Sequence, residues 1–314
     1  MSRKIYKYFS PQVAALALLQ DKATLKCSLP SNFNDPYELF LTVDYSSRPD
    51  ALASYQELIG TLPQLPTTCF SKSPAVVPMW AHYGANASGF ALEFDEAELL
   101  KAFPGSKLED VVYQDEASPD LTEMLYRAHV IGKPRYTYFL QGGVFHAAYF
   151  TKATCWSYEA ERRMVAAENE VREAHGMLFM DVPVNCITSV IAGAKASAGL
   201  ILMLSESADH YGCGLYRTQI GRTSISPYFL DNAGIPHVFN GSGIAAAAAS
   251  CRSCKEPLEP SNEACSWCQI TDDQRYSAAV RNPYRILDSV GHLDSYLASM
   301  NKITEGITRS RKGS

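Results

Sequence analysis

Polar and apolar positions along the first 230 residues predict short strands between irregularly placed helices. Residues 4–8 alternate polar and apolar side chains, and residues 67–71 and 89–94 have the composition of buried strands. Further short runs predict strands at residues 24–28, 111–113, 164–166, 176–181 and 190–192. This mixture favours an α+β fold over a regular alternation of strands and helices around a parallel sheet.

Helical spacing of apolar residues predicts helices at residues 12–19 and 77–83. We expect Ser10 to cap the first helix, with Pro11 in its first turn. Residues 30–36 are rich in turn formers and predict a loop.

The pattern changes after residue 232, where we place the end of the main domain, 1–232. Residues 233–250 contain Gly-Ser-Gly and five consecutive alanines, which predicts a linker. Beyond residue 270, apolar and aromatic side chains recur at helical spacing, so residues 271–314 are predicted to form a helical tail.

Two Cys-x-x-Cys pairs lie between the linker and the tail, within residues 251–270. Cys251 and Cys254 form the first pair, and Cys265 and Cys268 form the second. Each pair can direct two thiolates at one ion, and four thiolates complete a closed tetrahedral zinc shell. We therefore predict a structural zinc ribbon. The alternatives are two disulfides, which a reducing compartment disfavours, and a chance arrangement of cysteines.

Composition narrows the choice of function and location. The chain has 314 residues, of which 46% are hydrophobic, and a formal charge of −5, so it is not a protein that coats nucleic acid or anionic lipid through charge alone. No run approaches the roughly 20 apolar residues of a membrane helix, and residues 1–9 lack the apolar segment of a secretory signal.

The other cysteines indicate the same compartment. Five of the nine occur singly among apolar neighbours, as reduced core residues do: Cys27, Cys69, Cys155, Cys186 and Cys213. We expect a cytoplasmic protein with no membrane partner.

Common catalytic motifs are missing from the sequence. It contains no GxxxxGK[ST], GxGxxG, GxSxG or HExxH pattern, and its seven histidines lack metal-ligand spacing. These absences weigh against kinases, Rossmann dehydrogenases, α/β-hydrolases and zincin proteases.

Four local motifs remain, and their combination is distinctive. In chain order they are Tyr6-Lys7-Tyr8, Phe33-Asn34-Asp35-Pro36-Tyr37-Glu38, Cys69-Phe70-Ser71 with Met79-Trp80-Ala81-His82-Tyr83, and Trp156-Ser157-Tyr158-Glu159-Ala160-Glu161-Arg162. Together they resemble a large uncharacterised bacterial family, a domain of unknown function, over about residues 4–230.

The order of these motifs also resembles the ADP-ribosyltransferase fold, which surrounds NAD with three elements. That resemblance implies a split β-sheet core with peripheral helices. It implies catalytic roles for Glu161 and, in support, Glu159, and NAD contacts by Tyr6, Lys7, Tyr8, Asn34, Asp35, Ser71, Trp80, His82 and Tyr83. The chain departs from the pattern in having no first-strand His or Arg and no complete Ser-Thr-Ser.

The implied chemistry is physically coherent. Breaking the nicotinamide–ribose bond develops an oxocarbenium-like centre, which a nearby carboxylate stabilises. Aromatic faces hold the cationic nicotinamide. Residues two apart on a strand point to the same face, so Glu159 and Glu161 are both expected to face the cleft.

Each residue also has a structural interpretation. Glu-x-Glu-Arg is common on solvated helices, and Trp80, Tyr83 and Trp156 are residue types that are often found in cores. Ser71 can satisfy a backbone group, and Asp35 can cap a helix. We expect Lys152 and Arg163 to be solvated.

The leading functional hypothesis is an NAD-dependent mono-ADP-ribosyltransferase, a bacterial toxin or phage-defence effector with an antitoxin or inhibitor protein as partner. Arg252, Lys255 and Trp267 give the ribbon a small basic and aromatic surface, which favours RNA or DNA over protein as the acceptor. The alternatives are a non-catalytic nucleotide- or nucleic-acid-binding protein and an NAD glycohydrolase.

Overall fold

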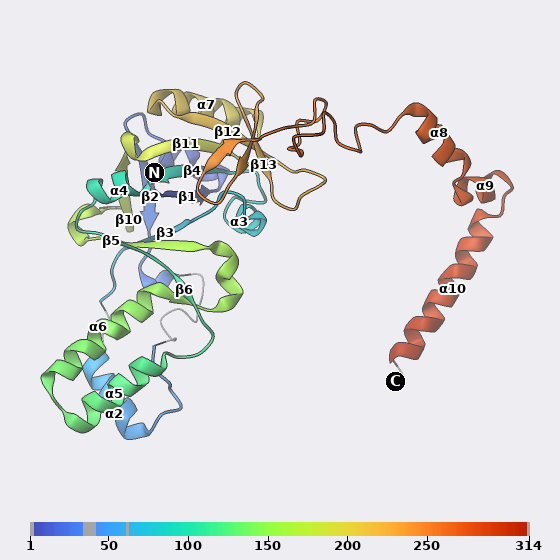
Figure 1. Ribbon diagram of the computed structural model, residues 1–314. Coiled ribbons are helices and arrows are strands. Elements are labelled where there is room, and N and C mark those ends of the chain that lie inside the picture. Colours follow the sequence, from blue (N-terminus) through green and yellow to red (C-terminus); the bar gives the residue numbers. More distant parts are fainter. Residues whose placement is uncertain (1–2, 34–41, 61–62, 313–314) are drawn as a thin grey trace. The chain divides into compact units, whose positions relative to one another are not determined.

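The protein folds as two compact units, Met1–Ala247 and Ala248–Ser314. A computed structural model describes residues 3–33, 42–60 and 63–312 (Figure 1). The division corrects the predicted domain boundary at residue 232. Two strands lie within the predicted linker 233–250, and both belong to the sheet of the first unit.

A large mixed sheet forms the first unit. Within the described residues it has ten strands, in the spatial order β15 (Ile244–Ala246), β14 (Pro236–Phe239), β13 (Tyr228–Asp231), β12 (Gly214–Gln219), β11 (Ile187–Ala192), β4 (Phe90–Asp95), β1 (Lys4–Phe9), β3 (Thr67–Ser71), β8 (Glu161–Val165) and β5 (Lys107–Asp110). Among these neighbours only β11 and β12 run parallel. The predicted α+β class is confirmed.

Two smaller sheets accompany the large one. The first contains β2 (Lys22–Cys27), β10 (Met177–Pro183) and β9 (Arg172–Ala174), and the second contains β6 (Val112–Tyr113) and β7 (Thr151–Lys152). An isolated bridge between Ser28 and Thr67 connects the end of β2 to the start of β3.

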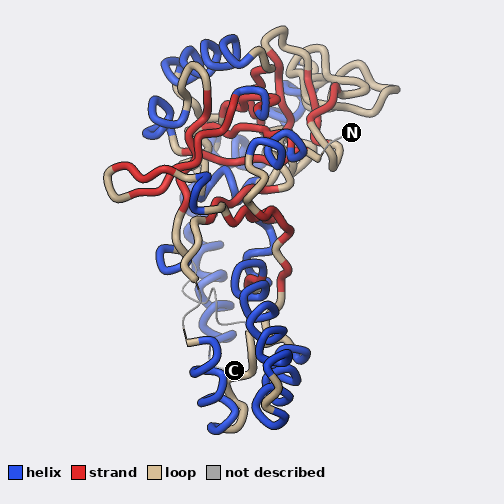
Figure 2. Tube along the Cα trace, turned by 90° about the vertical axis from the view of Figure 1, so that its left-hand side faces the viewer, coloured by secondary structure: helices blue, strands red, loops and turns tan. Residues whose placement is uncertain are grey.

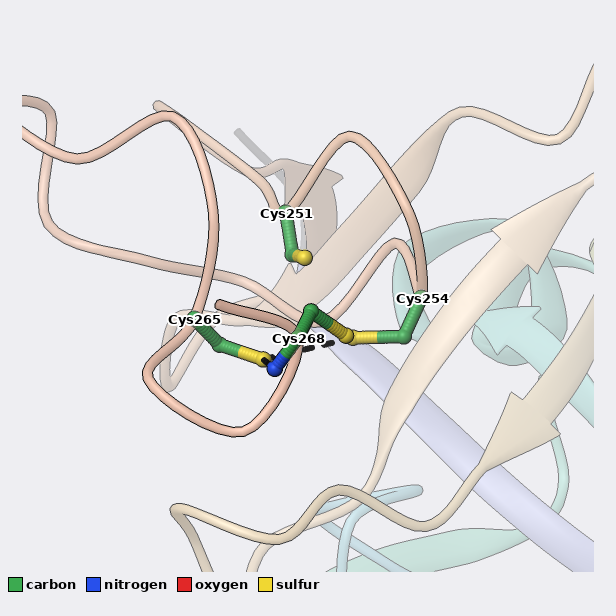
Figure 3. A group of neighbouring side chains, drawn as sticks. All are labelled: Cys251, Cys254, Cys265 and Cys268. Carbon is green, nitrogen blue, oxygen red and sulfur yellow. Dashed lines mark hydrogen bonds between the residues drawn. The ribbon is translucent and has the colours of Figure 1, made fainter. Parts of the chain in front are cut away.

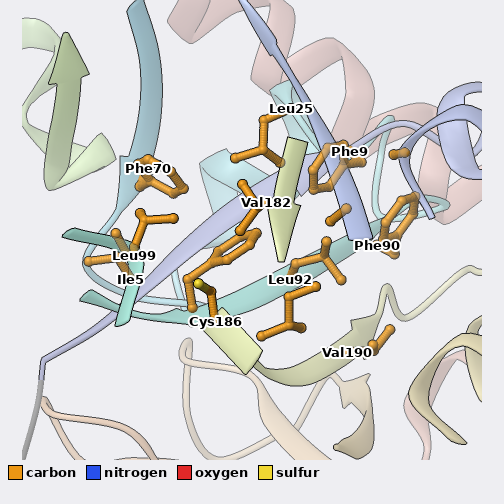
Figure 4. Close-up of a cluster of buried hydrophobic side chains, with 14 of the residues drawn as sticks. Ile5, Phe9, Leu25, Phe70, Phe90, Leu92, Leu99, Val182, Cys186 and Val190 are labelled. Atoms are coloured by element: carbon orange, nitrogen blue, oxygen red, sulfur yellow. The ribbon is translucent and has the colours of Figure 1, made fainter. Parts of the chain in front are cut away.

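The main core lies between the large sheet and its coverings (Figure 4). Phe90, Leu92 and Phe94 alternate along β4 and point to the same face, where they meet Leu25 of β2 and Val182 of β10. Two helices complete this side, α4 (Glu96–Ala102) and α7 (Ala198–Tyr211), which contribute buried leucines to the same cluster.

The opposite face of the sheet carries a second cluster. Tyr6 and Tyr8 of β1 point to this side and pack with Met79 and Trp80 of α3 (Val77–His82). The two faces of β1 therefore serve different cores, and Lys7 points to the same face as Ile5 and Phe9.

The sheet is nearly split between β1 and β3. These neighbours share one register pair, Tyr6 with Ser71, whereas β1 pairs with β4 over its whole length. Beyond that point the Lys7 Nζ donates a hydrogen bond to the carbonyl oxygen of Cys69, at 3.1 Å. The Lys7 side chain therefore bonds to a carbonyl of β3 at the point where the backbone pairing between β1 and β3 ends.

Three helices form a separate lobe of the first unit: α2 (Pro49–Ile59), α5 (Pro119–Ile131) and α6 (Pro134–Phe150). They pack around a small apolar cluster of their own. Figure 1 shows these labelled helices at one end of the unit and the large sheet at the other, and the turned view of Figure 2 agrees. Because β7 follows α6 directly, the lobe leads into the two-stranded β6–β7 sheet.

The remaining elements of the first unit are short. They are η1 (Pro11–Val13), α1 (Ala14–Ala17), η2 (Pro30–Asn32), η3 (Thr154–Glu159), η4 (Glu168–Glu170) and η5 (Val184–Cys186). The helix predicted at residues 12–19 is thus a 3₁₀ turn followed by one α-helical turn. Ser10 forms no side-chain cap there.

The second unit contains the four-cysteine segment and three helices, α8 (Asp272–Val280), α9 (Pro283–Ser289) and α10 (Leu293–Lys312). Thr271 and Gln274 form a capping box at the start of α8. No described helix of the chain is long and apolar enough to cross a membrane.

Candidate functional site

A pocket of about 180 Å3 opens where β1 and β3 separate. Strands, a helix end and a turn contribute its walls. Its lining residues are Tyr6, Lys7, Tyr8, Lys26, Ser28, Asn32, Phe33, Thr67, Thr68, Cys69, Phe70, Ser71, Met79, Tyr83, Lys152, Glu159, Glu161 and Arg163. All four sequence motifs thus supply residues to one cavity, the second of them through Phe33.

Glu161 is buried in this pocket at the start of β8, with 3% of its surface exposed. Its Oε1 accepts from Arg163 Nε at 2.7 Å, and its Oε2 accepts from Arg163 Nη2 at 3.1 Å. Burial alone would raise the pKa of this carboxyl, but Arg163 and Lys152 outweigh it and hold the pKa at about 2. Glu161 is therefore ionised at neutral pH.

Glu159 is equally buried but has different partners. Tyr83 Oη donates to its Oε1 at 2.6 Å, and Lys152 Nζ donates to its Oε2 at 2.7 Å. Burial raises the pKa of Glu159 above its ordinary value, and the nearby charge of Glu161 adds to the increase, against the opposing effect of Lys152 and Tyr83. Two carboxyls in one pocket are thus shifted in opposite directions, a pattern found in acid–base sites.

The backbone at Ala160 brings the two glutamates together. Glu159 ends η3, so the expectation that both glutamates lie on one strand was wrong. Ala160 has a φ of 45°, in the left-handed region, and it turns the chain directly into β8. A residue other than glycine in the left-handed backbone region costs about 1–2 kcal/mol of stability. This corner directs both side chains into the pocket.

Lys152 and Arg163 are buried, which corrects the expectation that they are solvated. Arg163 is 1% exposed and Lys152 is 7% exposed. Arg163 stands two residues after Glu161 on β8, so both point to one face, and its Nη1 donates to the carbonyl of Tyr149 in the last turn of α6 at 2.9 Å. Sequence analysis missed these cations, although the spacing of Arg163 from Glu161 indicated a shared face.

The β1 residues reach the pocket differently. Tyr6 donates its hydroxyl to Glu93 at 2.8 Å, and Tyr8 donates to the carbonyl of Ser73 at 2.9 Å, so both hydroxyls are already bonded. Burial lowers the pKa of Lys7 below its ordinary value. Lys7 is the β1 residue that places a basic side chain where β1 and β3 separate.

Ser71 fixes the backbone next to the corner. Its Oγ donates to the carbonyl of Glu159 at 2.7 Å, and Glu161 is its partner across the β3–β8 ladder. This geometry agrees with the structural interpretation of Ser71, since its hydroxyl satisfies a backbone carbonyl.

Trp80 and His82 do not line the pocket, so the pocket does not support the NAD contacts expected of these two residues. Trp80 is 3% exposed, donates its indole N–H to the carbonyl of Pro74 at 2.8 Å and packs edge-on against Tyr8. His82 is exposed. Asn34 and Asp35 lie outside the described residues.

The four cysteines of the second unit converge on one point (Figure 3). Their ligand atoms all lie within 4.8 Å of one another, and Cys251 and Cys265 are buried. The Sγ atoms of Cys254 and Cys265 are 3.8 Å apart. Tetrahedral sulfurs about 2.3 Å from a zinc ion are about 3.8 Å apart, so this group can hold a metal such as zinc.

The backbone around the cysteines has the turns that such a site needs. Lys255 follows the first pair with a φ of 65°, and its N–H donates to the carbonyl of Cys251 at 2.9 Å. The N–H of Cys268 donates to the Cys265 sulfur at 3.4 Å, which stabilises negative charge on that atom.

One comparison with known proteins gave a match. Residues 79–164 match a family described as "Protein of unknown function (DUF2971)". This segment is similar to that uncharacterised family, and it runs from α3 to β8. It therefore includes Tyr83, Lys152, Glu159, Glu161 and Arg163. No curated protein and no solved structure matches the chain.

Proposed function

We propose that the first unit is an NAD-dependent mono-ADP-ribosyltransferase whose reaction takes place at the Glu159–Glu161 pocket. The observation that carries this proposal is the pair of buried carboxyls with opposite pKa shifts beside a cavity at the split in the sheet. An ionised carboxylate suits stabilisation of a sugar cation, and a carboxyl with a raised pKa suits proton transfer near neutral pH.

The volume of the pocket limits which part of NAD it holds. About 180 Å3 accommodates roughly six waters at about 30 Å3 each, which is the scale of one small ring with its sugar and not of a whole dinucleotide. In the proposal the nicotinamide-ribose end enters the pocket, and the phosphates lie toward Lys26. Lys26 is exposed, lines the pocket and takes part in no described ion pair, so in the proposal it attracts the phosphates, whereas Lys7 Nζ is bonded to the Cys69 carbonyl.

The proposed step conserves atoms and charge. The bond between the nicotinamide nitrogen and ribose C1 breaks, and its electron pair leaves with nicotinamide. Glu161 stabilises the resulting oxocarbenium-like cation. A hydroxyl or amine of the acceptor then bonds to C1, and its proton passes to Glu159 and on to solvent.

The second unit supplies the proposed acceptor contact. We infer that its four cysteines bind structural zinc, because a closed shell of four thiolates has no position for a substrate. Arg252 has a side chain 76% exposed and Trp267 is 61% exposed, as a nucleic-acid contact requires. RNA or DNA is therefore the favoured acceptor, in the setting of a bacterial toxin or phage-defence protein.

The test compares native protein with Glu161→Gln and Glu159→Gln, using NAD labelled in its adenylate phosphate and mixed RNA, DNA and protein acceptors. Native protein is expected to release nicotinamide and transfer label, and Glu161→Gln is expected to lose about 100-fold in rate. Glu96→Gln is the matched control, because Glu96 pairs with the neighbouring Arg162 and does not line the pocket. Equal rates in native protein and Glu161→Gln would exclude the role of Glu161.

One observation favours a second candidate, a non-catalytic nucleotide-binding protein. Both oxygens of Glu161 already accept hydrogen bonds from Arg163, as in a structural ion pair. This candidate predicts NAD binding without nicotinamide release, and Glu161→Gln would then alter stability alone. Release of free ADP-ribose with no labelled acceptor would instead indicate an NAD glycohydrolase.

A further inference from the structure

We propose that Lys152 is a positioning residue, whose ammonium group holds Glu159 and Glu161 side by side and keeps Glu159 available as a proton acceptor. This inference deepens the proposed function and rests on it for the reaction, but the ion-pair arrangement has its own test. The sequence analysis assigned Lys152 no role.

The position of Lys152 is built by two elements. It ends β7, directly after α6, and pairs with Tyr113 across the β6–β7 ladder. Its carbonyl accepts from the N–H of Gln114 at 3.0 Å. The backbone is thus fixed, and the side chain runs inward with 8% of its surface exposed.

The ammonium group bridges the two carboxylates. Lys152 Nζ lies 2.7 Å from Glu159 Oε2 and 3.4 Å from Glu161 Oε2. The same nitrogen lies 4.8 Å from the centroid of the Trp156 ring, so an aromatic face covers one side of the cation. In this proposal Trp156 helps to hold the Lys152 ammonium group in place and does not itself contact the ligand.

The groups facing Glu159 show why one cation matters. Lys152 comes from β7, Tyr83 from the end of α3, Tyr158 from η3, Tyr113 from β6 and the Glu161 carboxylate from β8. The tyrosines are neutral at physiological pH, and Arg163 is bonded to Glu161. Among the described ion pairs, that with Lys152 is the one in which Glu159 takes part.

Loss of the ammonium group would leave Glu159 buried beside another carboxylate. Like charges in one site cannot both remain ionised without cost, so Glu159 would take up a proton at a higher pH. A protonated Glu159 cannot accept the proton of an attacking group. Lys152 therefore acts on the reaction through Glu159, without touching the reacting atoms.

The first experiment measures nicotinamide release by the full-length protein from pH 5 to 9. Lys152→Met is expected to move the acidic limb of the profile upward by one pH unit or more, and Lys152→Arg is expected to restore it. Lys107→Met is the control, because Lys107 pairs with Glu109 outside the pocket. A profile lowered in height but unmoved along the pH axis would overturn the proposal.

The second experiment is independent of activity and compares thermal unfolding of Lys152→Met with that of Lys152→Met/Glu159→Gln. The single variant leaves a buried carboxylate without its cation, and the double variant removes that charge. We expect the double variant to recover most of the melting temperature lost above pH 6. If Glu159→Gln restores nothing, Lys152 serves only in packing and the inference fails.

The two readouts separate two kinds of failure. Native protein that releases no nicotinamide would exclude the proposed function, while recovery of stability by Glu159→Gln would still establish the coupling of Lys152 to Glu159. If Lys152→Met does not fold, Lys152→Arg and the double variant carry the comparison. A double variant that also fails to fold would count against the proposal, since it contains no unpaired Glu159 charge.

Discussion

Ala160 separates the two glutamates of the pocket, and its left-handed backbone allows a short 3₁₀ helix to continue directly into β8. Glycine adopts this conformation without steric cost but loses more entropy on folding. Ala160→Gly is therefore expected to leave the free energy of unfolding unchanged or to raise it by up to about 1 kcal/mol. Ala160→Val should lower it by more than about 1 kcal/mol, because β-branched residues fit this region poorly.

Urea unfolding measures both changes, with Ala147→Gly in the helix α6 as the control. Glycine in a helix interior costs about 1 kcal/mol relative to alanine. If Ala160→Gly destabilised the protein as much as Ala147→Gly, residue 160 would not have a left-handed backbone in solution.

Glu161 makes stability depend on pH in the acidic range. Its pKa falls from an ordinary value of 4.5 to about 2 in the folded protein. Its stabilising contribution is therefore complete above about pH 4.5 and disappears as the pH falls toward 2, and it is on the order of 3 kcal/mol. The difference in free energy of unfolding between native protein and Glu161→Gln, measured from pH 2 to 6, should shrink with acidification. A constant difference would contradict the depressed pKa.

At the level of single residues, sequence analysis predicted the acidic groups of the site better than the basic ones. Glu159 and Glu161 stood out because carboxylates two apart form a known motif, and both lie in the pocket. Lys152 carries no such signal, since its proposed role depends on the chain passing from the helical lobe into the two-stranded β6–β7 sheet. Trp80 was misplaced because an aromatic residue in a motif and one in a core have the same sequence signature.

Along the strand β8, neighbouring arginines point to opposite faces and have different environments. Arg163 bonds to buried Glu161, whereas Arg162 pairs with Glu96 and has a side chain 13% exposed. Arg163→Met leaves Glu161 without its principal buried partner, which typically costs 3–5 kcal/mol. Arg162→Met should cost no more than about 2 kcal/mol.

Chemical denaturation of the two variants tests this difference, and Arg163→Met/Glu161→Gln should recover part of the loss. Similar losses for the two single variants would mean that the Glu161–Arg163 pair is not buried in solution.

Elements with compact local signals were predicted closely from the sequence. The segment 67–71 coincides with β3, and residues 77–83 contain α3. The strands β14 and β15 were taken for a linker because both are short, Gly-Ser-Gly lies between them and the alanine run begins within β15. Their strand conformation comes from pairing with β13, which is a tertiary interaction that local composition does not encode.

At the scale of the whole molecule, the two units are expected to respond separately to metal removal. A strong chelator should extract one zinc ion per chain and unfold the four-cysteine segment, because a segment with so small an apolar cluster depends on metal binding for its stability. The first unit, with its own cores, should keep its melting transition. Zinc release can be followed with a metal-sensitive dye, and unfolding by limited proteolysis.

Cys254→Ser should abolish zinc retention, and Cys155→Ser, which changes an exposed cysteine of the first unit, should not. A purified native protein that contains no metal and resists proteolysis in the second unit would contradict the zinc assignment.

The attachment of α6 to the pocket has a consequence for control from a distance. The last turn of this helix is bonded to Arg163, and the next two residues lead to Lys152, so both cations that set the charge of the carboxyls are joined to the helical lobe. A molecule that binds α2 or α5 and displaces α6 would shift Arg163 and Lys152. It would thereby change the charge of the two carboxyls without entering the cavity. If the proposed reaction takes place in this pocket, an inhibitor bound to the lobe would act by a non-competitive route.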